Sequence, residues 1–159
     1  MVRSPTSALP ASLPSAEAVA GAGVVAFDPG RNVGIAWVSP GGSLLRHAVI
    51  GADELPRVPV PAGAHVVIGD GTGSRRLAAS LRALGFHPEL VDEAGTSEIG
   101  RMLYWRRHPP RGIGRLVPLG LRVPPRPVDD FAAYAIALRV LGGRTGLTDP
   151  GLRSRRSAP

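Results

Sequence analysis

Three short apolar runs follow one another near the start of the chain, and the sequences between them are typical of tight turns. The runs are VVAFD (24–28), VGIAWV (33–38) and SLLRHAVI (43–50), and they are separated by PGRN and SPGG. Apolar runs of this length, joined through Pro-Gly and Gly-Gly turns, are typical of β-hairpins. We therefore expect an antiparallel three-stranded meander.

A strand, a helix and another strand are expected after this meander. AHVVIGD (64–70) and FHPELVDE (86–93) are short apolar runs that end in acids. In the segment between them, 71–85, leucines recur at helical spacing, and Gly85 stands where a helix C-terminus is expected. Two strands joined through a helix run parallel. These strands are therefore predicted to extend the sheet in parallel.

Two further helices and two irregular connections complete the pattern. TSEIGRMLYWRRH (96–108) and VDDFAAYAIALRVLGG (128–143) predict helices. The prolines of 51–63, and the Pro, Gly and Arg residues of 109–127, predict connections without long helices. The sequence as a whole predicts an α/β domain in which helices flank a mixed five-stranded sheet.

The length of the chain suits one folded domain between two flanking segments. It has 159 residues, of which 43% are hydrophobic. Residues 1–22 are expected to be a flexible leader and 143–159 a flexible basic tail, which leaves 23–142 as the domain. Cysteine is absent, and no run approaches the roughly 20 apolar residues of a membrane-spanning helix. We expect a cytoplasmic protein with no membrane partner.

The chain is strongly basic, and all of its basic side chains apart from histidine are arginines. Its formal net charge is +7. Arginine abundance is also what a GC-rich genome produces, but the guanidinium group is well suited to bidentate phosphate contact. The charge therefore favours a polyanionic partner.

Acidic residues stand at one predicted edge of the sheet. The C-terminal ends of parallel strands share an edge, and ligands of open α/β sheets bind there. Asp28, Asp70 and Glu93 follow the apolar parts of three strands and are expected to converge, with the start of the last helix supplying one more carboxylate. The acids at these positions are Asp28, Asp70, Asp92, Glu93, Asp129 and Asp130.

Such a set of carboxylates has two interpretations. Carboxylates a few ångströms apart either take up protons or bind cations. Oxygen ligands favour Mg²⁺ or Mn²⁺, which commonly act in pairs at phosphoryl-transfer sites. Taken singly, Asp28 and Asp70 are also good turn residues, and Asp129 and Asp130 are good helix caps. Their common edge favours the metal site.

Four blocks of the sequence resemble those of a known fold family. FDPGRNVGIAWV, VVIGDGTGSRR, VDEAGTSE and VDDFAAYAIAL resemble, in that order, the four blocks of the RNase-H-like fold of YqgF-type proteins and Holliday-junction resolvases. IGDGTGSRR followed by VDEAGTS is especially similar to the YqgF-like domain of Tex-type transcription accessory proteins. The resemblance covers about residues 24–142 and implies an RNase-H-like fold.

The resemblance also implies metal-dependent cleavage of a nucleic-acid phosphodiester by an Asp, Glu, Asp set. Asp28, Glu93 and Asp129 match these catalytic and metal-binding positions. Asp130 is the neighbour that can replace Asp129, and Asp70 is either an additional ligand or a turn residue. The implied cofactor is Mg²⁺ or Mn²⁺.

An arginine-rich segment with interleaved aromatics, 101–126, has the composition of a nucleic-acid-binding surface. Of Tyr104 and Trp105, one is expected to lie in the core and the other to stack on a base. Arg75 and Arg76 begin a predicted helix, where a further phosphate can bind. The candidate substrate-binding residues are Arg75, Arg76, Trp105, Arg106, Arg107, Arg111 and Arg115, with Arg101, Arg122 and Arg126 in the same segment as most of them.

Two functions fit these features. One is a nuclease acting on branched DNA, single-stranded DNA or RNA such as an rRNA precursor. The other is a catalytically inactive nucleic-acid-binding module of the Tex-like type, whose departure from the YqgF pattern, Ala94 in place of Arg, this chain shares. An actin-like phosphotransferase would need a much longer chain. Resolution of a junction would call for a two-fold homodimer.

Overall fold

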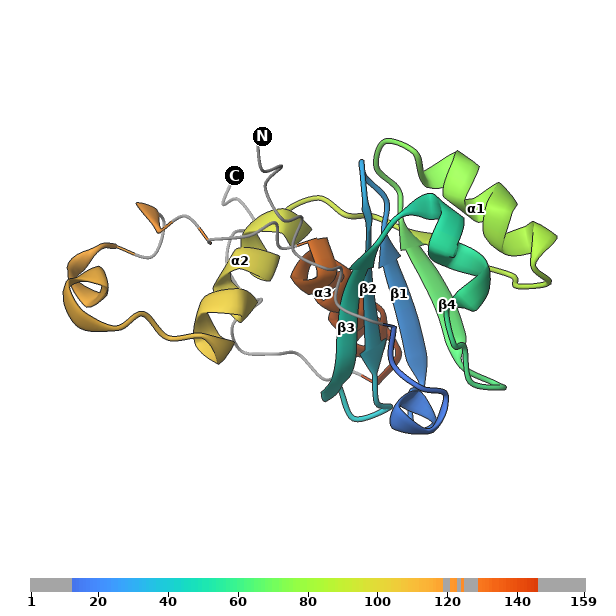
Figure 1. Ribbon diagram of the computed structural model, residues 1–159, viewed down its shortest axis with the longest axis horizontal. Helices are drawn as coiled ribbons and strands as arrows, with labels where there is room; N and C mark the ends of the chain where they lie inside the picture. The colour runs from blue at the N-terminus through green and yellow to red at the C-terminus, as the bar shows by residue number, and fades with distance from the viewer. Residues whose placement is uncertain (1–12, 119–120, 123, 125–128, 146–159) are drawn as a thin grey trace, which may run out of the picture.

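Five strands form one open mixed sheet in the computed structural model, which describes residues 13–118, 121–122, 124 and 129–145 (Figure 1). The strand order is β3-β2-β1-β4-β5. β1 pairs antiparallel with β2, and β2 with β3, whereas β1 and β4, and β4 and β5, run parallel. The strands are β1 Val24–Asp28, β2 Val33–Val38, β3 Leu44–Ile50, β4 His65–Gly69 and β5 Glu89–Val91.

Helices cover both faces of the sheet (Figure 1). The face of α1 also carries the 3₁₀ helix η2, and α3 covers the opposite face, with α2 packed against α3. The helical segments are η1 Glu17–Val19, η2 Ala52–Arg57, α1 Ser74–Ala83, α2 Thr96–Arg107, η3 Gly112–Leu116 and α3 Asp129–Thr145. No helix among the described residues is both long and apolar enough to span a membrane.

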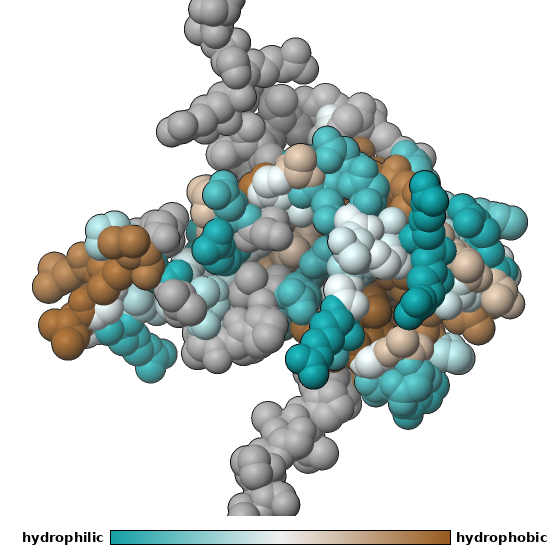
Figure 2. Space-filling model, turned by 90° about the horizontal axis from the view of Figure 1, so that it is seen from above, coloured by the Kyte–Doolittle hydropathy of each residue, from teal (hydrophilic) through white to brown (hydrophobic). Residues whose placement is uncertain are grey.

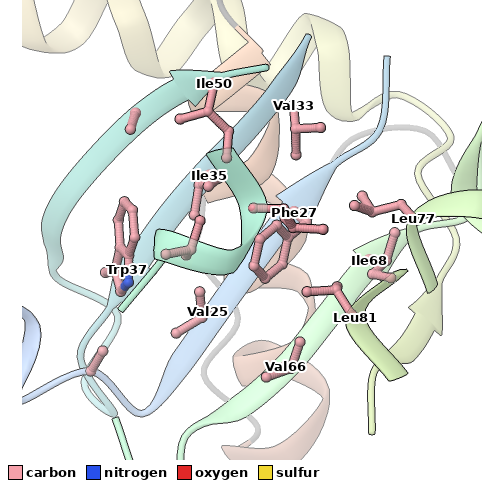
Figure 3. Packing of buried hydrophobic residues seen from close by; sticks show 14 of the residues in the cluster. Val25, Phe27, Val33, Ile35, Trp37, Ile50, Val66, Ile68, Leu77 and Leu81 are labelled. Atoms are coloured by element: carbon pink, nitrogen blue, oxygen red, sulfur yellow. The ribbon is translucent and has the colours of Figure 1, made fainter. Parts of the chain in front are cut away.

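The larger part of the core lies between the sheet and α1. Successive residues of a strand point to opposite faces, so Val25 and Phe27 of β1 pack on this side together with Leu77 and Leu81 of α1 (Figure 3). Trp37 is also fully buried here, and its indole N–H donates to the carbonyl of Pro59 over 2.7 Å. A buried indole needs such a partner.

The core on the α3 face is built from smaller side chains. It includes Ala26, Ala36, Ala133 and Ala137, which let α3 lie close to the sheet. Gly34 takes this further, because a Cβ placed on it would lie 2.2 Å from the carbonyl carbon of Asp129. The sequence of β2 therefore fixes where α3 begins.

The predicted mixed five-stranded sheet is confirmed, as are helices close to the expected positions. Helix formation in α1 ends before Gly85, which has a φ of 92° that glycine adopts readily. The folded region begins earlier than residue 23, because Val19 of η1 is fully buried and packs in the main core. The short helix η3 lies in the segment where only irregular structure was expected. Val128 and most of the expected tail lie outside the described residues.

Candidate active site

Three carboxylates from different parts of the chain gather at the C-terminal edge of the parallel strands. Asp28 ends β1, and it projects from the α3 face because Val24 and Ala26 face that helix. Its cross-strand partner is Gly34, on which the first residue of α3, Asp129, is packed. Burial, and then the nearby charges of Glu93 and Asp129, raise the pKa of Asp28 to about 7. A shift of this kind marks a site that favours either a proton or a cation.

Glu93 lies over the end of β4 because two glycines leave room for it. A Cβ placed on Gly71 would lie 1.8 Å from Oε1 of Glu93, and one placed on Gly69 would lie 2.6 Å from Oε2. Oε2 is buried and has no hydrogen-bond partner within the described part of the chain. Burial of a carboxylate oxygen without a partner is costly, so this atom is suited to a ligand that the described residues do not supply.

Several hydrogen bonds hold the backbone around Glu93. The N–H of Glu93 donates to Oδ1 of Asp70 over 3.1 Å, and its carbonyl accepts from Oγ1 of Thr96 over 2.7 Å. The guanidinium of Arg139, from α3, donates to the carbonyl of Asp92 and, over 2.7 Å, to that of Ala94. Asp70 therefore supports the position of Glu93, in an exposed loop.

Asp130 is placed differently from Asp129. It is only 1% exposed, and its Oδ2 accepts from Nδ1 of His47 on β3 over 2.5 Å, while Oδ1 accepts from the N–H of Phe131 over 3.0 Å. The His47 ring also lies 5.1 Å from that of Phe131. These contacts tie the start of α3 to β3, so Asp130 anchors the helix that presents Asp129.

The donor set fits a hard divalent cation in its chemistry. Asp28, Glu93 and Asp129 are close enough to interact electrostatically, and Glu93 offers a buried oxygen without a partner. Oxygen ligands of this kind suit Mg²⁺ or Mn²⁺. As the side chains stand, no group of three or more acids and histidines among the described residues is arranged to hold a metal ion.

The candidate substrate-binding arginines lie in two exposed regions. Arg75 and Arg76 are at the start of α1. The others extend along α2 and η3, away from the sheet (Figure 1). In this second region Arg115 and Arg122 donate to backbone carbonyls of their own segment. The exposed arginines of the second region are Arg101, Arg106, Arg107, Arg111 and Arg115, and Arg126 lies outside the described residues.

The same region carries aromatic and aliphatic side chains. Tyr104 is buried, as expected for one of the two aromatics, and Trp105 is half-buried at 5.2 Å from it in a T-shaped contact. Figure 2 shows a hydrophobic patch over the η3 end of the molecule. Ile113, Leu116 and Leu121 are 85%, 82% and 73% exposed there. This surface therefore offers apolar as well as cationic contacts.

Two side chains that sequence reasoning did not select support the site. Arg139 is the lone basic residue between Asp129 and Leu141, in an otherwise apolar part of the helix, and that isolation is a usable signal. His47 carries no such signal, because its partner Asp130 is 83 residues away in the sequence.

Comparison with known proteins adds no assignment. No protein-family model matches the chain, and no curated protein matches it.

Proposed function

We propose that this protein is a divalent-metal-dependent nuclease of RNase-H-like fold, in which Asp28, Glu93 and Asp129 bind the metal. The observation that carries this proposal is the meeting of three carboxylates at one edge of the sheet, where Asp129 is packed on the cross-strand partner of Asp28 and Glu93 has a buried oxygen without a partner. Burial and the charges of Glu93 and Asp129 raise the pKa of Asp28 to about 7. Carboxylates are seldom kept together in a partly buried site unless a cation or a proton is part of their role. The antiparallel meander followed by parallel strands supports the fold assignment.

The side chains of this site have distinct tasks. Asp28 interacts with both of the other carboxylates, because the charges of Glu93 and Asp129 each raise its pKa. Glu93 provides the oxygen that has no partner, and Asp129 is fixed by the packing of α3 on Gly34. Bound Mg²⁺ or Mn²⁺ would supply activation of water and stabilisation of the leaving oxygen.

A basic chain with two regions of exposed arginines supports a nucleic-acid substrate. The net charge is +7, and arginines lie both at the start of α1 and along α2 and η3. Phosphate contacts by such residues supply most of the sequence-independent affinity of nucleic-acid-binding proteins. Branched DNA, single-stranded DNA and RNA all meet this requirement.

The test is cleavage of labelled branched DNA, single-stranded DNA and RNA in Mg²⁺ or Mn²⁺. Wild type is expected to cut at least one of them, and Asp28→Asn is expected to lose about 100-fold or more of that rate, because it removes a charge at the reacting centre. Asp53→Asn is the matched control, since Asp53 is exposed on η2 and outside the carboxylate site.

The possible outcomes separate the two candidate functions. Cutting that is lost in Asp28→Asn and kept in Asp53→Asn supports the nuclease. Tight, salt-sensitive binding without any cutting by the wild type would refute it and leave a nucleic-acid-binding module. Equal cutting by all three proteins would show that the activity comes from a contaminant or from another site.

A further inference from the structure

A pocket of about 710 Å³ lies at the same edge of the sheet, on the side of α1. Two loops and two helical segments form it: the turn after β1, the loop between β4 and α1, the first turns of α1, and η2. Its volume is in the range of pockets that enclose small ligands. Its lining includes the cationic Arg31, Arg75 and Arg76, the acidic Asp70, and the aliphatic Val33, Leu55 and Leu77.

At the start of α1 the N–H of Ser74 donates to the carbonyl of Gly71 over 3.1 Å, whereas the N–H groups of Arg75 and Arg76, which line the pocket, have no partner within the described part of the chain. Gly73, the residue before the helix, has a φ of 87°, and no side chain caps the helix. Ser74 also lines the pocket and is only 6% exposed, yet its hydroxyl makes no hydrogen bond within the described part of the chain. The Ser74 oxygen is not among the fully buried side-chain atoms, so within the pocket it is open to a ligand.

The chemistry of the walls specifies the ligand. Free N–H groups at a helix start, a nearby hydroxyl and guanidinium groups together favour an oxyanion, above all a phosphate. The aliphatic side chains that line the same pocket suit a sugar or base rather than a bare ion. A nucleotide carries both parts.

We propose that this pocket binds the phosphate of a nucleotide, with Ser74 and the arginines around it as ligands. The pocket and the carboxylates share the loop of Asp70 and Gly71, but the carboxylates lie on the α3 face of the sheet. A strand that crosses this edge contacts both. Where the ligand is such a strand, the inference rests on the proposed nuclease, and the phosphate bound in this pocket is not the one that is cleaved.

The experiment measures binding in EDTA, so that no metal-dependent cleavage takes part. The backbone amide signals of residues 72–77 are followed by NMR while inorganic phosphate, a nucleoside monophosphate and a six-nucleotide single strand are added in turn. These signals are expected to shift with each probe. Tighter binding of the strand identifies a nucleic-acid subsite, and tighter binding of the monophosphate identifies a site for free nucleotide.

Two matched variants test the role of the arginines. Arg75→Ala/Arg76→Ala is expected to weaken binding of the six-nucleotide strand about tenfold, because charge-assisted hydrogen bonds are lost. Arg82 is exposed on the same helix but lies outside the pocket. Arg82→Ala is expected to change strand binding less than about twofold, since a distant surface charge contributes little. Ser74→Ala is expected to weaken binding about threefold, the low end for one hydrogen bond.

The inference is overturned if residues 72–77 do not respond to any probe, or if Arg82→Ala weakens binding as much as the double variant. Failure of the nuclease would look different. A protein that binds in this pocket but cuts no substrate in Mg²⁺ or Mn²⁺ supports the pocket and refutes the proposed activity. A protein that cuts a substrate but does not bind in this pocket supports the nuclease and refutes the pocket.

Discussion

The two sides of the sheet edge carry opposite charges and are built in different ways. On the α3 face, Asp28, Glu93 and Asp129 are partly buried, and β1, the loop after β5, and α3 must all pack correctly to bring them together. On the α1 face, Arg31, Arg75 and Arg76 are exposed on a turn and on a helix start. The acidic side thus depends on tertiary packing, whereas most of the basic side follows from local structure.

This difference predicts how each side responds to change. Exposed charges cost the fold little, so arginine substitutions on the α1 face are expected to alter binding and leave stability almost unchanged. Partly buried like charges oppose folding, so removal of a carboxylate charge on the α3 face is expected to raise stability and lower activity.

The largest expected effect is on stability at high pH without divalent cations. The pKa of Asp28 rises from 3.8 to about 7 on folding, so between these pH values the folded chain holds a proton that the unfolded chain releases. The stabilisation from this proton is complete below pH 3.8 and is lost as the pH rises through 7. Asp28→Asn should therefore be more stable than wild type at pH 8, by at most about 4 kcal/mol, and the gain should shrink toward pH 5.

Urea unfolding of wild type and Asp28→Asn between pH 5 and pH 8 in EDTA measures this difference in stability. Groups that titrate in the same way in both proteins do not contribute to the difference. Millimolar Mg²⁺ at pH 8 is expected to stabilise wild type and leave Asp28→Asn unchanged, because binding to the folded state alone shifts the unfolding equilibrium. A stability difference that does not vary with pH would contradict the raised pKa.

The next largest effect is expected from a variant that changes the carboxylate site and leaves the α1 pocket unchanged. In Gly71→Ala the new Cβ would lie 1.8 Å from Oε1 of Glu93, so that side chain must move. The far end of a glutamate moves easily, and the free energy of unfolding should fall by less than about 1 kcal/mol. Displacement of a reacting group by about 1 Å can cost about 100-fold in rate, and a loss of that size is expected in the cleavage assay.

Binding at the α1 pocket provides the contrast for Gly71→Ala. Gly71 also lines this pocket, but the three atoms nearest to the new Cβ all belong to Glu93, so phosphate binding by residues 72–77 should stay within about twofold of wild type. Gly41→Ala is the control, since its Cβ would meet Ser39 at an ordinary 3.9 Å. Equal cleavage by Gly71→Ala and Gly41→Ala would remove Glu93 from the site.

The sequence predicted the elements of the fold better than it predicted the contacts between them. Tight turns and apolar runs are local signals, and the meander, the parallel strands and the helices followed from them. The convergence of Asp28 and Glu93 was predicted because parallel strands end at one edge. The sequence alone does not show which of Asp129 and Asp130 faces the other carboxylates, because this depends on packing. The backbone of Asp129 packs on Gly34, whereas Asp130 is hydrogen-bonded to His47. The burial of Val19 was missed because a short alanine-rich segment has little helical or strand periodicity.

The smallest of these effects concerns a residue that joins the two long-range parts of the acidic site. Arg139 donates to the carbonyls of Asp92 and Ala94, on either side of Glu93, from the helix that begins with Asp129. Arg139→Gln should therefore loosen Glu93 and weaken Mn²⁺ binding and turnover about tenfold, as is typical when support for a metal ligand is lost. Arg139→Lys should recover part of the lost Mn²⁺ affinity and turnover, because an ammonium group reaches one carbonyl more readily than two.

The measurements for Arg139 are cleavage as a function of Mn²⁺ concentration and strand binding in EDTA. A positioning role lowers kcat and Mn²⁺ affinity while strand binding stays unchanged. If strand binding in EDTA falls by the same factor instead, Arg139 contacts the substrate or the variant is misfolded, and the melting temperature decides between these two.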